Sequence, residues 1–324
     1  MIEVEHITKR YGGVEAVTDL SFSVGKDQVL GFLGPNGAGK TTVMKILTGY
    51  HFPTSGRAAV EGFSVDDDPV EVKKRTGYLP ESVPLYGDMT VNEYLSFMAA
   101  ARQVPAAKRK AAVDESLASC GLVSMRHRLI ETLSKGYKQR VGLAQAIIHD
   151  PPILILDEPT SGLDPNQIIE IRQLIKDLGK RKTVILSTHI LQEVEAVCSR
   201  VLILNEGRIA AQGTSEEIAG TLKGGDTWEL TLKGSGAREK LAHFSEKFPP
   251  EVTENDNTCD ASFFLPAGGS GGAEAVAERI FDWAVAKELK ILSMKRRKYS
   301  LEDIFVKLTS DDNTRPEGAK EAGR

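Results

Sequence analysis

Residues 29–48 restrict the fold of this chain more than any other stretch. An apolar run, Val29 to Leu33, leads into a glycine-rich turn, and the turn leads into a segment with apolar residues at helical spacing. The turn at 34–41 has the sequence GPNGAGKT, which fits the pattern G-x-x-x-x-G-K-[ST]. Such glycines let consecutive backbone N–H groups surround an anion, and the following helix adds the positive end of its dipole. This order predicts a P-loop, and therefore a nucleoside triphosphate site.

The predicted nucleotide contacts fill this turn and the first residues of its helix. They are Gly34, Pro35, Asn36, Gly37, Ala38, Gly39, Lys40, Thr41 and Thr42. Lys40 can reach the β- and γ-phosphates, and the Thr41 hydroxyl is placed to ligate Mg²⁺.

Two further apolar runs end in residues with acid, base or metal-binding chemistry. Residues 153–156 are wholly apolar and are followed by Asp157 and Glu158. Such a run suits a parallel strand buried on both faces, whose carboxyl end lies where ligands bind in open α/β sheets. We expect Asp157 to hold Mg²⁺ through water and Glu158 to face the γ-phosphate. The run 183–188 ends at His189, for which we favour a γ-phosphate contact over a purely structural role.

Tyr11 lies in a turn with Gly12 and Gly13, upstream of the P-loop. Its ring could stack on a nucleobase, a contact that tolerates any base. It could equally pack under the turn, and the residues alone leave both alternatives open.

The overall composition excludes several classes of protein. The chain is 41% hydrophobic and 27% charged, which is typical of a soluble protein with a core, and its net charge of −4 does not favour nucleic acid. No run approaches the ~18 apolar residues of a membrane span, and the N-terminus lacks a signal-peptide layout. Cys120, Cys198 and Cys259 match no metal spacing. We therefore expect a cytoplasmic protein with free thiols.

The remaining patterns predict an α/β domain followed by a smaller α+β domain. Apolar runs predict strands at 2–8, 20–24 and 28–33, and the capping box at 90–93 begins a helical insertion over 86–130. After Gly220 the chain becomes richer in glycine. There we expect strand 227–233, helix 237–247, strands 251–255 and 260–265, helix 273–288 and strand 290–296. That order predicts a ferredoxin-like accessory domain over 225–309, ending in an amphipathic helix at 300–308, with a disordered tail at 310–324.

Taken in order, these motifs resemble the nucleotide-binding subunit of an ATP-binding cassette (ABC) transporter over residues 1–220. The P-loop corresponds to Walker A, and Ile153 to Glu158 to the Walker B strand with its catalytic glutamate. Leu133 to Tyr137 stands at the signature motif, Ser161 to Asp164 at the D-loop, His189 at the switch histidine, and Tyr11 at the adenine-stacking aromatic. The run after Ser134 is similar to type-2 exporter ATPases, including the gliding-motility-like group.

The resemblance implies a P-loop NTPase fold with a RecA-like core, an N-terminal antiparallel β subdomain and a helical subdomain at about 86–150. It also implies a head-to-tail dimer that holds two ATP molecules with Mg²⁺. Ser134 and Gly136 would face the γ-phosphate on the partner, and Asp164 would contact across the dimer. Glu158 would be the general base, with Lys40 and His189 stabilising the γ-phosphate.

Two motifs depart from the family pattern. The signature has Lys135 where glycine is usual and Tyr137 where glutamine is usual. The Q-loop position is Glu81, which can still reach Mg²⁺ through an oxygen but adds a negative charge near the γ-phosphate. These departures bear on coupling more than on hydrolysis.

The leading hypothesis is the energising ATPase of a membrane exporter. It would work as a homodimer or heterodimer with a separate membrane-embedded permease, on the inner face of the membrane. The alternative is a non-transport ABC ATPase acting on nucleic acid or ribosomes, which the single cassette and the net charge disfavour. A regulatory subunit that binds ATP without hydrolysing it is disfavoured by Glu158 and His189. Nothing in the sequence identifies the cargo.

Overall fold

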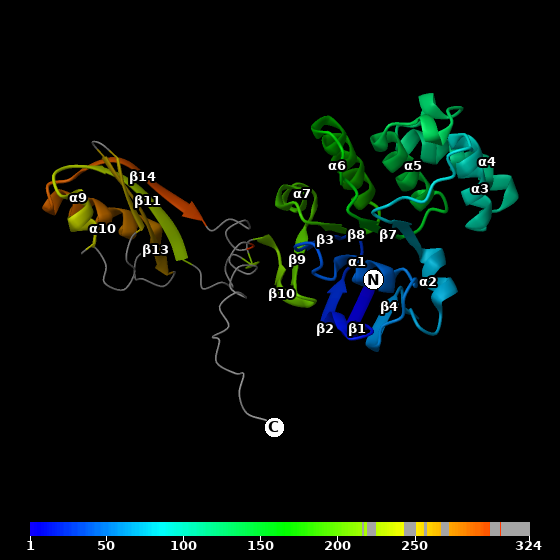
Figure 1. The fold of residues 1–324 in the computed structure, drawn as a ribbon, viewed down its shortest axis with the longest axis horizontal. Helices are drawn as coiled ribbons and strands as arrows, with labels where there is room; N and C mark the ends of the chain where they lie inside the picture. The colour runs from blue at the N-terminus through cyan, green and yellow to red at the C-terminus, as the bar shows by residue number, and fades with distance from the viewer. Residues whose placement is uncertain are drawn as a thin grey trace, which may run out of the picture. The chain divides into compact units, whose positions relative to one another are not determined.

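A six-stranded, mostly parallel sheet forms the centre of the first of two units (Figure 1). The computed structural model describes residues 1–215, 217–218, 225–242, 251–255, 258–266, 272–298 and 305. The units are Met1–Ser215 and Glu216–Arg324, so the division falls at Ser215 where the sequence suggested residue 220.

The main sheet has the strand order β10-β9-β3-β8-β7-β6. Its strands are β3 (Val29–Leu33), β6 (Thr76–Leu79), β7 (Ile153–Asp157), β8 (Thr183–Thr188), β9 (Arg200–Asn205) and β10 (Arg208–Gly213). β10 pairs antiparallel with β9, and the other neighbouring strands run parallel. Strands β3, β6, β7 and β8 therefore end at the same edge of the sheet.

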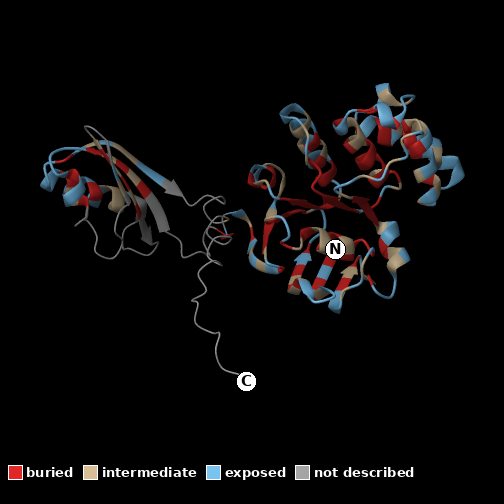
Figure 2. Ribbon diagram, viewed as in Figure 1, coloured by how far each residue is buried: buried red, intermediate tan, exposed pale blue. Residues whose placement is uncertain are grey.

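Each face of the main sheet packs on its own core, which explains why its strands are continuous apolar runs (Figure 2). Ile155 of β7 faces the core shared with helix α1 (Lys40–Leu47). The alternate residues Leu154 and Leu156 face the opposite core, beneath the larger helices.

The second sheet of this unit is antiparallel, with the order β2-β1-β4-β5. Its strands are β1 (Ile2–Tyr11), β2 (Val14–Val24), β4 (Ser55–Val60) and β5 (Phe63–Ser64). β2 begins six residues before the predicted start at 20, so β1 and β2 form a long hairpin around the turn at Gly12 and Gly13.

Helices cover the face of the main sheet to which Leu154 and Leu156 point. They are α3 (Val91–Ala101), α4 (Ala106–Ser119), α5 (Lys135–Ile147), α6 (Pro165–Gly179) and α7 (Leu191–Val197), with 3-10 turns η1 (Val123–Met125) and η2 (Ile130–Thr132). The predicted capping box is present at the start of α3, where Thr90 and Glu93 exchange hydrogen bonds. Sequence patterns missed α7 and α2 (Pro69–Arg75), which are shorter than two full helical periods.

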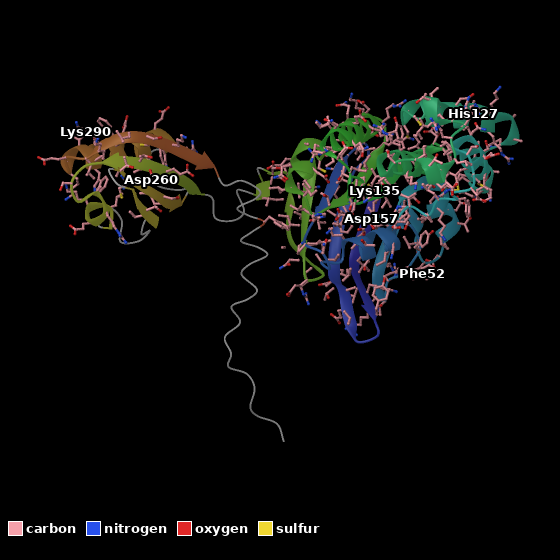
Figure 3. All side chains as sticks on the ribbon, turned by 45° about the horizontal axis from the view of Figure 1, so that its top comes forward. Phe52, His127, Lys135, Asp157, Asp260 and Lys290 are labelled. Atoms are coloured by element: carbon pink, nitrogen blue, oxygen red, sulfur yellow. The ribbon has the colours of Figure 1, made fainter. Side chains whose placement is uncertain are left out.

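The second unit alternates β-α-β-β-α-β, the order of a ferredoxin-like motif. Its elements are β11 (Gly225–Lys233), α9 (Ala237–Ala242), β12 (Glu251–Asn255), β13 (Thr258–Pro266), α10 (Gly272–Ala286) and β14 (Lys290–Lys298). The strands form an antiparallel sheet in the order β12-β13-β11-β14. Trp228 is buried in its core, where the chain's other tryptophan, Trp283, packs against it from α10. Asp260 and Lys290 mark this unit in Figure 3.

Two sequence predictions for the C-terminal end cannot be placed. The helix expected at 300–308 falls, apart from residue 305, outside the described residues, as does the tail at 310–324. Within the described part of the chain, no helix is long and apolar enough to cross a membrane. All three cysteines are free thiols, as expected.

Gly77 allows β6 to approach α5 closely. A Cβ atom at this position would lie 2.1 Å from the backbone carbonyl oxygen of Ala146, which cannot move without displacing the helix. At Gly13, in the β1–β2 turn, a Cβ atom would meet nothing within 4 Å.

We therefore expect Gly77→Ala to lower the free energy of unfolding of the first unit by about 1–3 kcal/mol, because overpacking forces a backbone shift. Urea titration followed by circular dichroism measures this, with Gly13→Ala as the matched control. Equal unfolding midpoints for the two variants would show that β6 and α5 can separate at no cost.

Candidate functional site

The P-loop is held tightly against the neighbouring hairpin. Gly39, immediately before α1, has a φ of 101°, a left-handed conformation that side chains rarely adopt. A Cβ atom there would also lie 2.5 Å from the carbonyl oxygen of Ala16 on β2. Both observations require glycine at this position, so the loop's shape follows directly from its sequence.

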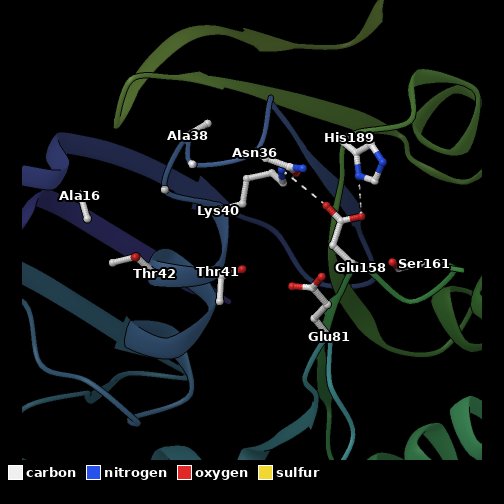
Figure 4. A pocket seen from close by; sticks show the side chains of 12 residues that line it. Ala16, Asn36, Ala38, Lys40, Thr41, Thr42, Glu81, Glu158, Ser161 and His189 are labelled. Carbon is white, nitrogen blue, oxygen red and sulfur yellow. Dashed lines mark hydrogen bonds and ion pairs between the residues drawn. The ribbon is translucent and has the colours of Figure 1, made fainter.

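A cavity of about 390 Å³ opens over this loop (Figure 4). It is lined by Ala16, Asn36, Gly37, Ala38, Gly39, Lys40, Thr41, Thr42, Glu81, Glu158, Ser161 and His189. The P-loop, the loop after β6, the end of β7 and the end of β8 thus meet at one place. This grouping was predicted from the shared carboxyl edge of parallel strands, whereas Ala16 was not predicted.

Glu158 stands between Lys40 and His189 in this cavity (Figure 4). Its Oε1 lies 3.5 Å from Lys40 Nζ, and its Oε2 lies 3.0 Å from His189 Nδ1. Lys40 Nζ also donates to the backbone carbonyl oxygens of Gly34, at 2.7 Å, and Pro35, at 3.2 Å. The arrangement places a carboxylate, an ammonium and an imidazole around one point above the P-loop.

The backbone of Glu158 is held by a serine that sequence analysis missed. Glu158 has a φ of 49°, and its N–H donates to Ser187 Oγ at 3.0 Å and to the Ser187 carbonyl oxygen at 3.2 Å. A non-glycine residue in this region is strained, and such strain persists only where the surroundings fix it. The one sequence signal was a small polar residue, Ser187, at the end of an apolar strand.

Burial raises the pKa of Glu158 above its ordinary value, although the charges of Lys40 and His189 oppose the rise. A carboxylate with a raised pKa accepts a proton more readily than a free one does. This is the property that a general base working near neutral pH requires.

Asp157 and Thr41 fit a magnesium ion. Asp157 Oδ1 accepts from Ser187 Oγ at 2.5 Å and from Thr41 Oγ1 at 3.2 Å. Its other oxygen, Oδ2, is buried and has no hydrogen-bond partner among the described residues. A buried, unpaired carboxylate oxygen beside a hydroxyl suits a hard cation that prefers oxygen ligands and keeps several waters.

Seven predicted site residues do not line this cavity. Three of them, Gly34, Pro35 and Asp157, accept hydrogen bonds from Lys40 or Thr41, which do line it. The other four are Tyr11, Ser134, Gly136 and Asp164. Ser134 begins α5, where its Oγ accepts from Tyr137 N–H at 3.5 Å, and Gly136 is buried in the first turn of that helix. Asp164 begins α6, and its Oδ1 accepts from Gln167 N–H at 3.0 Å. Tyr11 is 42% exposed at the end of β1. Their roles toward a nucleotide stay predictions.

Two of the three residues that depart from the family pattern, but not Tyr137, line a second cavity of about 540 Å³. Glu81 and Lys135 both line it, so the added negative and positive charges face the same space. Glu81 and Ser161 also line the first cavity. Figure 3 marks Lys135, together with Asp157 at the end of β7.

A P-loop with an acid pair and a histidine at the carboxyl edge of one parallel sheet defines a P-loop nucleoside triphosphatase. A family model described as ABC transporter matches residues 17–161. The uncharacterized ABC transporter ATP-binding protein YxlF of Bacillus subtilis is 34% identical over 95% of this chain and 99% of its own. The bacitracin transport ATP-binding protein BcrA of Bacillus licheniformis is 33% identical over 95% of this chain and 97% of its own.

A dimeric bacterial ABC transporter cassette has the same fold, with a TM-score of 0.61 and 25% identity over 66% of this chain and 98% of that one. The chain belongs to the ATP-binding subunits of ABC transporters. It is therefore an ATPase, and both the predicted fold class and the predicted nucleotide, ATP, are confirmed.

The raised pKa of Glu158 gives a pH-dependent stability with a definite sign. Below the ordinary value of 4.5 the carboxyl is protonated in both folded and unfolded chains, so burial carries no ionic cost. As the pH rises through the raised pKa, ionisation favours the unfolded chain. We expect the stability of the wild type relative to Glu158→Gln to fall over this interval, as measured by melting temperatures of nucleotide-free protein.

Glu93 supplies a control of opposite sign, because its hydrogen bonds from Thr90 lower its pKa. The wild type should therefore gain stability relative to Glu93→Gln as the pH rises toward 4.5. The raised pKa of Glu158 would be contradicted if the melting temperature of the wild type, relative to that of Glu158→Gln, stayed constant or rose with pH.

Proposed function

We propose that this chain energises a membrane exporter by closing, as one of a pair of nucleotide-binding subunits, on two ATP molecules. The single observation that supports it best is the Glu158 carboxylate held between Lys40 and His189 above the P-loop. The relative named for bacitracin transport, which this chain matches over nearly its full length, supports export. Homodimer and heterodimer are both compatible with this proposal.

Within one subunit, several side chains at and next to the first cavity would have distinct tasks. The backbone of the P-loop and the Lys40 ammonium would bind the β- and γ-phosphates. Glu158 would take a proton from the attacking water, and His189, 3.0 Å from it, would orient the carboxylate and contact the γ-phosphate. Asp157 and Thr41 would hold Mg²⁺, with Glu81 within reach from the loop after β6. Bound there, the ion would neutralise charge on the phosphates.

The partner subunit would complete the site. Ser134 and Gly136 stand at the first turn of α5, outside the first cavity, with a helix N-terminus whose positive dipole end suits an anion. In a head-to-tail pair, this turn would face the γ-phosphate bound by the other subunit. Asp164 at the start of α6 would contact across the pair, and Tyr11 would stack on the adenine.

We expect Glu158→Gln to lower kcat for ATP hydrolysis by about 10²–10⁴-fold while leaving ATP affinity intact, because only the proton acceptor is removed. The variant should accumulate as an ATP-bound dimer. Phosphate release and light scattering after size exclusion, both in Mg-ATP, measure the two effects.

Normal turnover by Glu158→Gln would exclude Glu158 as the base. A monomer under saturating Mg-ATP, with turnover abolished, would instead exclude the closing dimer. Stimulation of the wild-type ATPase by DNA or RNA would favour the alternative, non-transport function.

A permease would dock on the helical subdomain, where exposed aromatic rings gather. Tyr86 is 52% exposed and Phe97, on α3, is 46% exposed, with ring centroids 5.8 Å apart. We call these two residues the α3 aromatic patch. Exposed aromatic rings are enriched where protein partners bind.

Replacing both rings, Tyr86→Ala with Phe97→Ala, should abolish co-purification with any multi-span membrane protein that accompanies the wild-type chain. The ATPase activity of the isolated chain should persist, because the patch lies outside the first cavity. Val123→Ala, at a position 62% exposed in the same subdomain, is the matched control. Equal co-purification of the double variant and the control would place the permease contact elsewhere.

A further inference from the structure

Glu193 is a buried charged residue that the proposed mechanism does not use. Among the described residues, the buried charged side chains are Lys40, Asp157, Glu158 and Glu193. The first three belong to the proposed phosphate and metal site. Glu193 lies on α7 and does not line the first cavity. Burying a carboxylate is unfavourable unless hydrogen bonds compensate for its lost hydration.

The two oxygens of Glu193 bind two different loops of the site. Thr160 Oγ1 donates to Oε1, and Thr188 Oγ1 donates to Oε2 at 2.6 Å. Both threonines are buried. Thr160 follows Glu158 by two residues, and Thr188 immediately precedes His189. One carboxylate therefore joins the loop of the proposed base to the strand end that carries the proposed γ-phosphate contact.

The directions of these hydrogen bonds are fixed. Both threonine hydroxyls donate, and the two carboxylate oxygens of Glu193 accept. Thr188 Oγ1 also accepts from the Ile190 N–H at 3.0 Å, which uses its acceptor side and leaves its single proton for Glu193. Arg172 Nη2, 3.7 Å from Oε1, provides the nearby positive charge. Neither threonine can turn without losing a buried partner.

We propose that Glu193 is a positioning residue that sets the separation of Glu158 and His189. This inference rests on the roles proposed for those two residues. Ser187 already ties the backbone of Glu158 to β8 on one side. Glu193 supplies the second tie, from α7, so that the 3.0 Å contact between Glu158 Oε2 and His189 Nδ1 is held at both ends.

The test begins with Glu193→Gln, which preserves size and shape. The amide NH2 donates and cannot accept a hydrogen bond, so the proton of one of the two threonine hydroxyls loses its buried acceptor. We expect kcat for ATP hydrolysis to fall about 10- to 100-fold, as small misplacements of catalytic groups do. The dissociation constant for ATP should change less than about twofold, since the P-loop is untouched. Glu195→Gln, exposed on the same helix, is the matched control and should retain full kcat.

Thr188 provides an independent variant pair if Glu193→Gln does not fold. Thr188→Ser keeps the hydroxyl and should retain most of kcat, whereas Thr188→Val removes it and should lower kcat as Glu193→Gln does. The double variant Glu193→Gln with Thr188→Val should have a kcat only slightly below that of either single variant. Each single change already breaks the same link, through Glu193, between the loop of Glu158 and the end of β8.

Three results would overturn the inference. The first is an unchanged kcat in folded Glu193→Gln, and the second is an equal kcat for the serine and valine variants of Thr188. The third is a fall in kcat that is fully explained by a smaller fraction of molecules able to bind ATP. Glu158→Gln, measured alongside, distinguishes failure of the positioning role of Glu193 from failure of the base role proposed for Glu158. If it is inactive while Glu193→Gln is normal, only the positioning role fails, whereas an active Glu158→Gln removes the proposed base itself.

Discussion

The parallel register of β3, β8 and β7 is the constraint on which the site depends. Leu33 pairs with Thr188, and Asp157 pairs with Ser187, so the three strands end level with one another. The P-loop directly follows β3, His189 directly follows β8, and the acid pair consists of the last residue of β7 and the residue after it. A one-residue change of register would move a buried side chain to the opposite face of the sheet and draw the functional groups apart. The two cores that hold the sheet from both sides prevent this.

Electrostatics at this edge follow from burial. Lys40 and Glu158 are both buried, and each is costly to bury alone. Their 3.5 Å contact, the carbonyl oxygens around Lys40 and the imidazole beside Glu158 offset part of that cost. The remainder appears as the raised pKa of Glu158. Glu158 therefore has the raised proton affinity that the proposed general base needs, while Lys40 remains hydrogen-bonded to the backbone of the P-loop.

Local patterns predicted the parts of the site that lie next to one another in sequence. The P-loop, the strand before Asp157 and the strand before His189 each carry their own signal of apolar run and terminal polar residue. Ser187 and Glu193 could not be predicted, because their importance arises from partners about thirty residues away, Asp157, Glu158 and Thr160. The helices α2 and α7 were missed because seven residues are too few to show helical periodicity.

The distribution of tryptophan has an optical consequence. The chain contains two tryptophans, and both belong to the second unit: Trp228 is buried in its core, and the partly buried Trp283 packs against that core. Indole emission excited at long wavelength therefore arises from that unit alone, and the ATPase unit contributes none of it. A change in this emission on adding nucleotide would therefore report on the environment of the second unit, with no contribution from the unit that carries the P-loop.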